Sequence, residues 1–443
     1  MSFFKKVFSS SDNAANEKTS VSNNVAVGRY TEINKKAAQT EYWKKSQDDF
    51  SQKRHLDAFD KLLHYMLNPA VENIKINRRD GALNFEMLQG SKIIFGKADE
   101  NNFSAEARIA CYDRPSVAFL RKLMNMNYVL QYNRFAIKDD IIYLKFDSKT
   151  IDASPNKVYY ALRELALKCD KIDDNLVGEF EMLHAIDNGH TVDIPENLKE
   201  IKYKYLHRWI DEALNKISTL NEDRMSGGIS YILLALLFRI DYLLQPQGVF
   251  FEDIEKINGI YNAKDNKSTL ERNRLMIEEL KRVNGKSKEE IFKNLYEVKI
   301  TFGYVPATSH KQFYEFILEQ FKNTNWYYDN RYPDIVTCIY EWIIGYSLFY
   351  YGLFPPTYDF LKLAYTVMQP AYFAEMGAPL NLWNQANSTF NKTAIEKEIQ
   401  KIVRAHQPEY PKLAILMENI RYNNINDFLY TYLNEVTYLN FTK

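Results

Sequence analysis

The spacing of apolar side chains changes twice along the chain. Residues 40–67 repeat apolar positions at helical spacing and predict two helices. Residues 72–146 alternate apolar and polar positions, most clearly from Phe103 to Cys111, and predict strands with one buried face. The rest of the chain returns to helical spacing. The first 28 residues, by contrast, are too poor in apolar side chains to pack, so we expect a disordered tail.

Turn-forming and capping residues divide the alternating segment. Gly90 predicts one hairpin turn, and Asp139-Asp140 predicts another. Pro115 is expected in the first turn of a helix, and Ser154 is expected to cap a helix that runs to about residue 171. The strands are expected at residues 83–88, 92–95, 103–111, 134–138 and 141–146. This order of elements predicts an α+β module, in which helices pack on an antiparallel sheet.

Proline and glycine divide the remaining residues into helices. Helices are expected at residues 174–188, 196–221, 227–244, 268–283, 287–297, 309–322, 333–351, 357–373, 391–406, 411–422 and 425–440. No repeat period relates them, so the pattern predicts a mainly α-helical bundle or short solenoid. The predicted domains are a tail over residues 1–28, an α+β domain with a leading helical hairpin over 29–182, and an all-α domain over 183–443.

The segments Phe119–Tyr128 and Tyr132–Ile137 carry a family resemblance, together with the hairpin and helix that follow them. Residues 72–182 resemble the YbjN-like family, whose fold is similar to that of type III secretion chaperones. The resemblance implies a non-catalytic module that binds or regulates another protein. It also implies that a homodimer through the α+β domain is one arrangement to test. The family supplies no catalytic residues.

The charge balance and the cysteine content limit which classes of partner and which cellular compartment are expected. The 57 basic and 57 acidic residues balance, and a protein that neutralises many phosphates usually has a basic excess, so no nucleic acid is expected. The three cysteines form no close pair, which is typical of free thiols in a reducing compartment and favours the cytoplasm. Residues 2–8 contain Phe3, Phe4 and Phe8, but a frayed tail explains them better than a membrane anchor.

Two groups of titratable residues are candidates for chemistry. His184, Asp187, His190 and Asp193 have a spacing that a metal could use, although a helix end explains their charges more simply. Asp170, Asp173 and Asp174 are better explained as helix caps than as a cation site or an acid–base site. The sequence contains no nucleotide-binding glycine motif, zinc-protease motif or nucleophile elbow. No catalytic residue, metal or cofactor is therefore predicted.

One apolar run is long enough to span a bilayer, and a second, shorter run raises the same question. The run over residues 335–354 contains Glu341, and the run over residues 229–244 contains Arg239 and Asp241. A charge in a bilayer core costs about 2.5 to 3.5 kcal/mol even on the most lenient scale. Buried core helices therefore explain both runs better than membrane spans do.

Aromatic residues near predicted loops supply the candidate binding surface. Most of the 32 tyrosines are expected in the core, but Tyr304, Trp326, Tyr327 and Tyr328 are expected near the surface, where aromatic side chains often anchor partners. We therefore predict a cytoplasmic, non-enzymatic protein-binding adaptor, regulator or chaperone-like factor. The alternative is a regulator that binds a small ligand in an aromatic-lined pocket of the helical domain. An enzyme of a class without a recognisable motif is the third hypothesis.

Overall fold

The computed structural model describes residues 27–28, 35, 37–69, 71–186 and 191–442. These fall into two compact units, one from Val27 to Phe354 and one from Pro355 onward. The predicted boundary between residues 182 and 183 therefore lies inside the larger unit. Most of the predicted tail lies outside the described residues.

The last residue of the predicted tail, Gly28, is bound to the larger unit. Its amide N–H donates to the carbonyl oxygen of Tyr242 at 2.7 Å. The Gln245 side-chain amide donates to the carbonyl oxygen of Gly28 at 2.6 Å. These two hydrogen bonds attach Gly28 to the turn that carries Tyr242 and Gln245.

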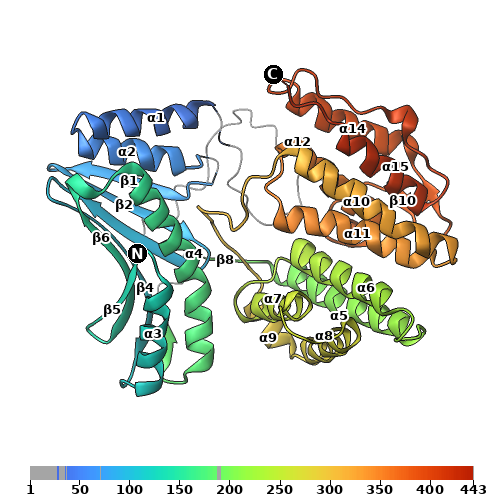
Figure 1. Cartoon of the computed structure of the whole chain (residues 1–443), viewed down its shortest axis with the longest axis horizontal. Helices are drawn as coiled ribbons and strands as arrows, with labels where there is room; N and C mark the ends of the chain where they lie inside the picture. Colours follow the sequence, from blue (N-terminus) through green and yellow to red (C-terminus); the bar gives the residue numbers. More distant parts are fainter. Residues whose placement is uncertain (1–26, 29–34, 36, 70, 187–190, 443) are drawn as a thin grey trace. The chain divides into compact units, whose positions relative to one another are not determined.

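A seven-stranded antiparallel sheet forms the first part of the larger unit (Figure 1). Its strands are β1 (Ile74–Arg79), β2 (Ala82–Gln89), β3 (Lys92–Ala98), β4 (Asn102–Tyr112), β5 (Arg134–Lys138), β6 (Ile141–Lys149) and β7 (Leu183–Ala185). They lie in the order β1-β2-β3-β4-β6-β5, and β7 pairs with the end of β4. This confirms the α+β prediction and both hairpin turns, at Gly90 and at Asp139-Asp140.

Helices pack on one face of this sheet. Helices α2 (His55–Met66) and α4 (Pro155–Glu179) contact the strands, α1 (Ala37–Ser51) packs on α2, and α3 (Val117–Val129) lies beside β5. Aromatic rings pack together on the buried face. Between ring centroids, Phe103 of β4 lies 4.9 Å from Phe59 of α2 and 6.1 Å from Phe146 of β6. Strand alternation thus places the predicted apolar positions against the helices.

Three details of the α+β prediction are wrong or incomplete. Strand β1 was not predicted, because in this polar edge strand only Ile74 is buried. The three-residue strand β7 was not predicted either. Pro115 precedes α3 instead of opening it, since Ser116 is the N-cap and its hydroxyl accepts a hydrogen bond from the Ala118 N–H. By contrast, Ser154 caps α4 as predicted, accepting from the N–H of Lys157.

The rest of the larger unit is mainly helical, as predicted. Its helices are α5 (Glu196–Ser218), α6 (Ser226–Arg239), the π-helical turn η2 (Ile240–Leu244), α7 (Gly248–Asn262), α8 (Thr269–Asn284), α9 (Lys288–Lys293), α10 (His310–Asp329) and α11 (Pro333–Tyr350). Helix α7 was not predicted. The predicted helix over residues 174–188 is wrong, because α4 continues to Glu179 and the chain then extends into β7.

A segment distant in sequence completes the core of the sheet. We call residues 299–304 the docking segment. Its Phe302 is fully buried within the core of the α+β part, 5.6 Å from the ring of Tyr159. The side chain of Gln89 accepts from the N–H groups of Thr301 and Phe302 and donates to the carbonyl oxygen of Phe302 at 3.2 Å. This contact explains why the larger unit does not divide at residue 182.

The smaller unit is also mainly helical. It contains α12 (Pro355–Met368), α13 (Pro370–Glu375), the strands β10 (Trp383–Asn384) and β11 (Thr389–Phe390), α14 (Lys392–His406), the short turn η3 (Met417–Asn419) and α15 (Ile425–Thr437). The predicted helix over residues 411–422 is wrong. Side chains of α15 hold this stretch instead, since Glu435 accepts from the N–H of Leu416 and Thr431 accepts from the N–H of Arg421.

Candidate functional site

Three of the four predicted surface aromatics lie together. Trp326, Tyr327 and Tyr328 occupy the last turns of α10, which runs to Asp329 instead of ending at the predicted residue 322. The indole of Trp326 stacks on the ring of Tyr332, with centroids 6.3 Å apart and planes 9° apart. Trp326 and Tyr328 are about half exposed. We call the stacked pair Trp326 and Tyr332 the aromatic cluster, and Tyr328 is a separate exposed ring two residues after Trp326 on α10.

Tyr327 is an internal support for this cluster. It is half-buried, and its ring lies 6.3 Å from that of Tyr231 in α6. A side chain at Gly228 would meet the Tyr327 ring at 3.2 Å and Ile335 at 2.9 Å, so this glycine permits the close approach of the helices. Burial raises the pKa of the Tyr327 hydroxyl and raises that of Tyr231 to about 12. Tyr327 therefore positions the exposed pair and offers little surface of its own.

The fourth predicted residue, Tyr304, lies away from the cluster and lines a pocket of about 170 Å³. The pocket lies between α6, η2, α7, α11 and the loop that carries Tyr304. Its lining residues are Phe238, Asp241, Tyr242, Phe251, Glu255, Tyr304, Val305, Gly345, Leu348, Phe349 and Tyr350. The hydroxyl of Tyr350 accepts a hydrogen bond from the side-chain amide of Asn258 at 2.7 Å.

A smaller cavity of about 40 Å³ shares Phe251, Glu255 and Tyr304 with this pocket. It is also lined by Asp170 and Lys171 of α4, and Lys171 forms an ion pair with Glu255 at 2.7 Å. Tyr304 thus lies where the helical part of the larger unit meets α4.

The prediction that Asp170 caps a helix is wrong, because this residue lies inside α4. Its carboxylate accepts from the N–H of Ser91 at 3.0 Å. It lies so close to the β2–β3 turn that a side chain at Gly90, where φ is +57°, would overlap it at 1.6 Å. Asp170 therefore fastens the helix to the turn. The side chains of Asp173 and Asp174 lie outside the described part of the structure.

The predicted metal-like group does not form on a helix. His184 lies in β7, where its Nε2 is 2.8 Å from the carboxylate of Asp113, and Asp193 pairs with Lys199 at 2.5 Å. Asp187 and His190 lie outside the described residues. Among the residues that the structure describes, no group of three or more His, Cys, Asp or Glu side chains is placed to hold a metal ion.

An exposed apolar stripe on α3 was not predicted from the sequence. Val117, Met124 and Tyr128 lie seven and four residues apart, which places them on one face of the helix. All three are exposed, and Tyr128 retains 92% of its surface. The helical period of these residues was visible in the sequence, but the burial of Phe119 and Leu123 on the opposite face was needed to tell the faces apart.

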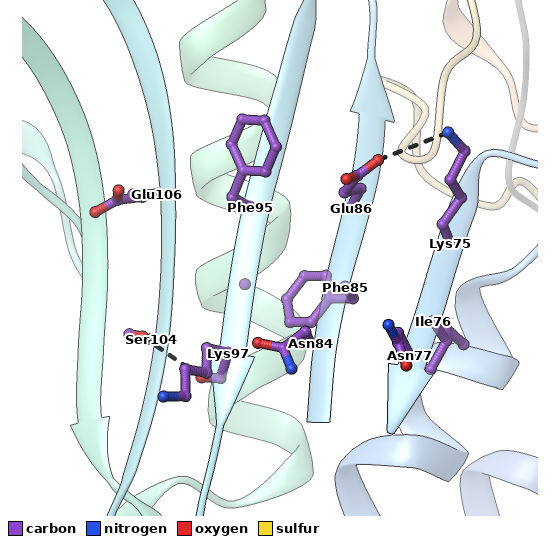
Figure 2. A pocket seen from close by; sticks show the side chains of 11 residues that line it. Lys75, Ile76, Asn77, Asn84, Phe85, Glu86, Phe95, Lys97, Ser104 and Glu106 are labelled. Atoms are coloured by element: carbon purple, nitrogen blue, oxygen red, sulfur yellow. Dashed lines mark hydrogen bonds and ion pairs between the residues drawn. The ribbon is translucent and has the colours of Figure 1, made fainter. Parts of the chain in front are cut away.

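The sheet face opposite the helices carries a groove of about 540 Å³, which Figure 2 shows from close by. Two lining glutamates pair with lysines on neighbouring strands. Lys75 lies 3.6 Å from Glu86, as Figure 2 shows. Glu106 lies 2.7 Å from Lys145, which is not part of the groove lining. Phe95 lies between the two glutamates, on the strand between theirs. The groove is therefore lined mainly by polar and charged side chains, with Phe95 between the two glutamates.

One charged residue of each long apolar run pairs with the other, namely Arg239 with Glu341. The guanidinium of Arg239 in α6 donates to the carboxylate of Glu341 in α11 at 2.5 Å, and it lies 5.4 Å from the indole centroid of Trp209. Within the described residues, only the helical stretch Ser226–Leu244 is long and apolar enough to cross a bilayer, and 83% of its most apolar window is buried in the protein. Burial also raises the pKa of the nearby Cys338 thiol to about 11.

Comparison with known proteins adds no relative. No protein-family model matches the chain, and no curated protein matches it.

Proposed function

We propose that this chain is a non-enzymatic, cytoplasmic protein-binding adaptor or chaperone-like factor. The aromatic cluster of α10 and α11 is the observation that carries the proposal. Tryptophan and tyrosine dominate the energetic centres of protein interfaces, because they offer large rigid surfaces and a polar group. Trp326 and Tyr328 are about half exposed although Tyr327 between them is packed inside, so the chain presents these two rings to solvent.

The stripe on α3 supports a second protein contact on the same unit. A helix that leaves a methionine and a tyrosine exposed on one face has the composition of an interface helix. We propose that a second copy of the chain binds here, which is also the arrangement that the YbjN-like resemblance of residues 72–182 implies. The balanced charge of the chain gives no support for a nucleic-acid partner.

Affinity capture with surface variants tests the adaptor function. The full-length protein would be compared with Trp326→Ser, Phe95→Ser and Tyr160→Ser variants, which alter the cluster, the sheet groove and an exposed tyrosine of α4. We expect a partner that Trp326→Ser loses and Tyr160→Ser retains, and the purified partner should show the same ranking by calorimetry. A partner lost only with Phe95→Ser would move the site to the groove. Equal capture by all variants, or no partner at all, would refute the proposal.

The homodimer has its own test. Light scattering after gel filtration gives the mass of the wild type and of Tyr128→Glu. We expect a dimer that the charged substitution dissociates, because a carboxylate in an apolar interface has no partner there. A wild type that stays monomeric at high concentration would contradict this arrangement without affecting the aromatic cluster.

A second candidate function has a specific observation behind it. The pocket at Tyr304 is lined by aromatic rings together with a few polar groups, which is the usual composition of a small-ligand site. We therefore propose, as the alternative, a regulator that binds a small ligand in this pocket.

A further inference from the structure

A buried lysine of the smaller unit has no hydrogen-bond or ion-pair partner among the residues that the structure describes. This lysine is Lys362 of α12, and only 7% of the residue is exposed. Lysines are rarely buried unless they are paired, because an ammonium group loses its hydration when it leaves water. The position of this side chain therefore calls for an explanation beyond packing.

An aspartate–histidine pair lies beside the lysine. Asp359 is three residues before Lys362 on α12, which places the two side chains on the same side of the helix. The Asp359 carboxylate lies 2.7 Å from Nε2 of His406, the last residue of α14, and both of these side chains are only 12% exposed. The charges of His406 and Lys362 both act on Asp359. The three titratable groups therefore form one buried cluster within the smaller unit.

Burial shifts the protonation of this cluster toward neutral forms. It lowers the pKa of the Lys362 ammonium group, and the charge of Asp359 offsets this only in part. It also raises the pKa of the Asp359 carboxyl, although the hydrogen bond with His406 opposes that change. A larger fraction of Lys362 is therefore the neutral amine, which is the nucleophilic form of lysine.

Lys202 in the larger unit shows how a buried lysine serves a purely structural role. It is 3% exposed, and burial lowers its pKa to about 8. Its ammonium group donates to the carbonyl oxygen of Leu244 at 2.8 Å, at the end of η2, where the helical hydrogen bonds stop. Within the described part of the chain Lys362 has no such acceptor, and it has an acid–base pair one helical turn away instead.

We infer that Lys362 is a covalent binding site for a small aldehyde, with His406 and Asp359 as its acid–base pair. The neutral amine attacks the carbonyl carbon, and a proton passes from the nitrogen to the oxygen. The protonated imidazole of His406 then donates a proton to the departing hydroxyl group, so that water leaves and the C=N bond forms. The proton on the iminium nitrogen returns to the imidazole, and the Asp359 carboxylate stabilises the imidazolium form.

The balance of this step is one amine and one aldehyde giving one imine and one water, so it needs no oxidant or reductant. The low exposure of Lys362 restricts the ligand to a small molecule. This site goes beyond the binding functions proposed above and does not depend on either of them, because it lies in the smaller unit.

Reductive trapping of the full-length protein tests the site. The protein would be incubated at neutral pH with acetaldehyde and cyanoborohydride, which reduces an imine to a stable secondary amine, and the labelled lysines would be located by peptide mass spectrometry. We expect Lys362 to be labelled at least ten-fold faster than the buried Lys202 and the exposed Lys281. His406→Gln keeps a hydrogen-bonding group beside Asp359 but cannot transfer the proton. It should slow the labelling of Lys362 at least ten-fold and leave the circular dichroism and the labelling of Lys281 unchanged.

Each outcome has a definite meaning. Labelling of exposed lysines without Lys362 would overturn the inference. Equal labelling of Lys362 and Lys202 would also overturn it, because burial alone would then explain the reactivity. An unchanged rate in His406→Gln would overturn the role of the acid–base pair. If His406→Gln does not fold, the comparison of the three lysines in the wild type still decides whether Lys362 is the reactive site.

Discussion

Phe302 provides the sharpest test of the fold, because it ties the docking segment to the sheet. Its side chain is 0% exposed, although it follows the last strand of the sheet by more than 100 residues. Replacing a buried phenylalanine by alanine removes its apolar contacts and leaves a cavity, which together cost about 3 to 5 kcal/mol. We expect Phe302→Ala to lower the free energy of unfolding of the larger unit by that amount.

The backbone of the docking segment contributes separately. Gln89 accepts from two of its N–H groups, Thr301 donates to the carbonyl oxygen of Leu88 at 2.7 Å, and Asn73 donates to Thr301 at 3.0 Å. These hydrogen bonds remain in Phe302→Ala, so the segment should stay near the sheet while the core loosens. A fragment that ends at residue 182 would lose both contributions and should be much less stable.

Urea denaturation followed by circular dichroism measures the effect. The matched control is Tyr304→Ala, two residues away but nearly half exposed, for which we expect a loss below about 1 kcal/mol. A loss below about 1 kcal/mol for Phe302→Ala as well would refute the reasoning, and the docking segment would then be an ordinary surface loop.

Three further substitutions test the interior. Phe146→Ala should lower the free energy of unfolding by about 3 to 5 kcal/mol in urea denaturation, because the side chain is buried against Phe103 in the core of the sheet. A loss below about 1 kcal/mol would contradict the strand register that places Phe146 on the buried face. Arg239→Leu should lower the free energy of unfolding by about 3 to 5 kcal/mol, because it leaves the Glu341 carboxylate buried and unpaired. Replacing both residues by leucine should cost less, and equal losses would mean that the two side chains are not coupled. Burial lowers the pKa of Lys202 from 10.5 to about 8, so the folded chain releases this proton before the unfolded chain does and stability should rise between those pH values. Between about pH 7 and pH 9.5 the gain should be on the order of 1 to 2 kcal/mol and absent in Lys202→Met; the same slope in both proteins would assign the gain to other groups.

The local pattern was sufficient wherever side-chain spacing and capping decide the structure. The hairpin turns, the N-cap at Ser154 and the apolar helices containing Arg239 and Glu341 followed from period, turn chemistry and the cost of an unpaired charge. The sequence also supplied Tyr304 as a candidate, although it did not indicate that this residue lines a pocket. It could not give the pocket itself, because the lining comes from α6, η2, α7, α11 and a loop, which lie between residues 238 and 350 of the chain.

Tertiary structure decided the features that depend on contacts between distant residues. The strand β1 is polar because its edge position leaves only Ile74 buried, and residues 411–422 avoid a helix because Glu435 and Thr431 bind their backbone N–H groups. Asp170 belongs to α4, but its carboxylate binds the backbone of the turn at Gly90 and Ser91, about 80 residues earlier in the chain. Periodicity reports which side of an element is apolar, and therefore the sequence by itself determined the fold class. Which segment of the chain packs against the apolar side of an element depends on the whole chain. Only the structure placed Phe302 in the core of the sheet.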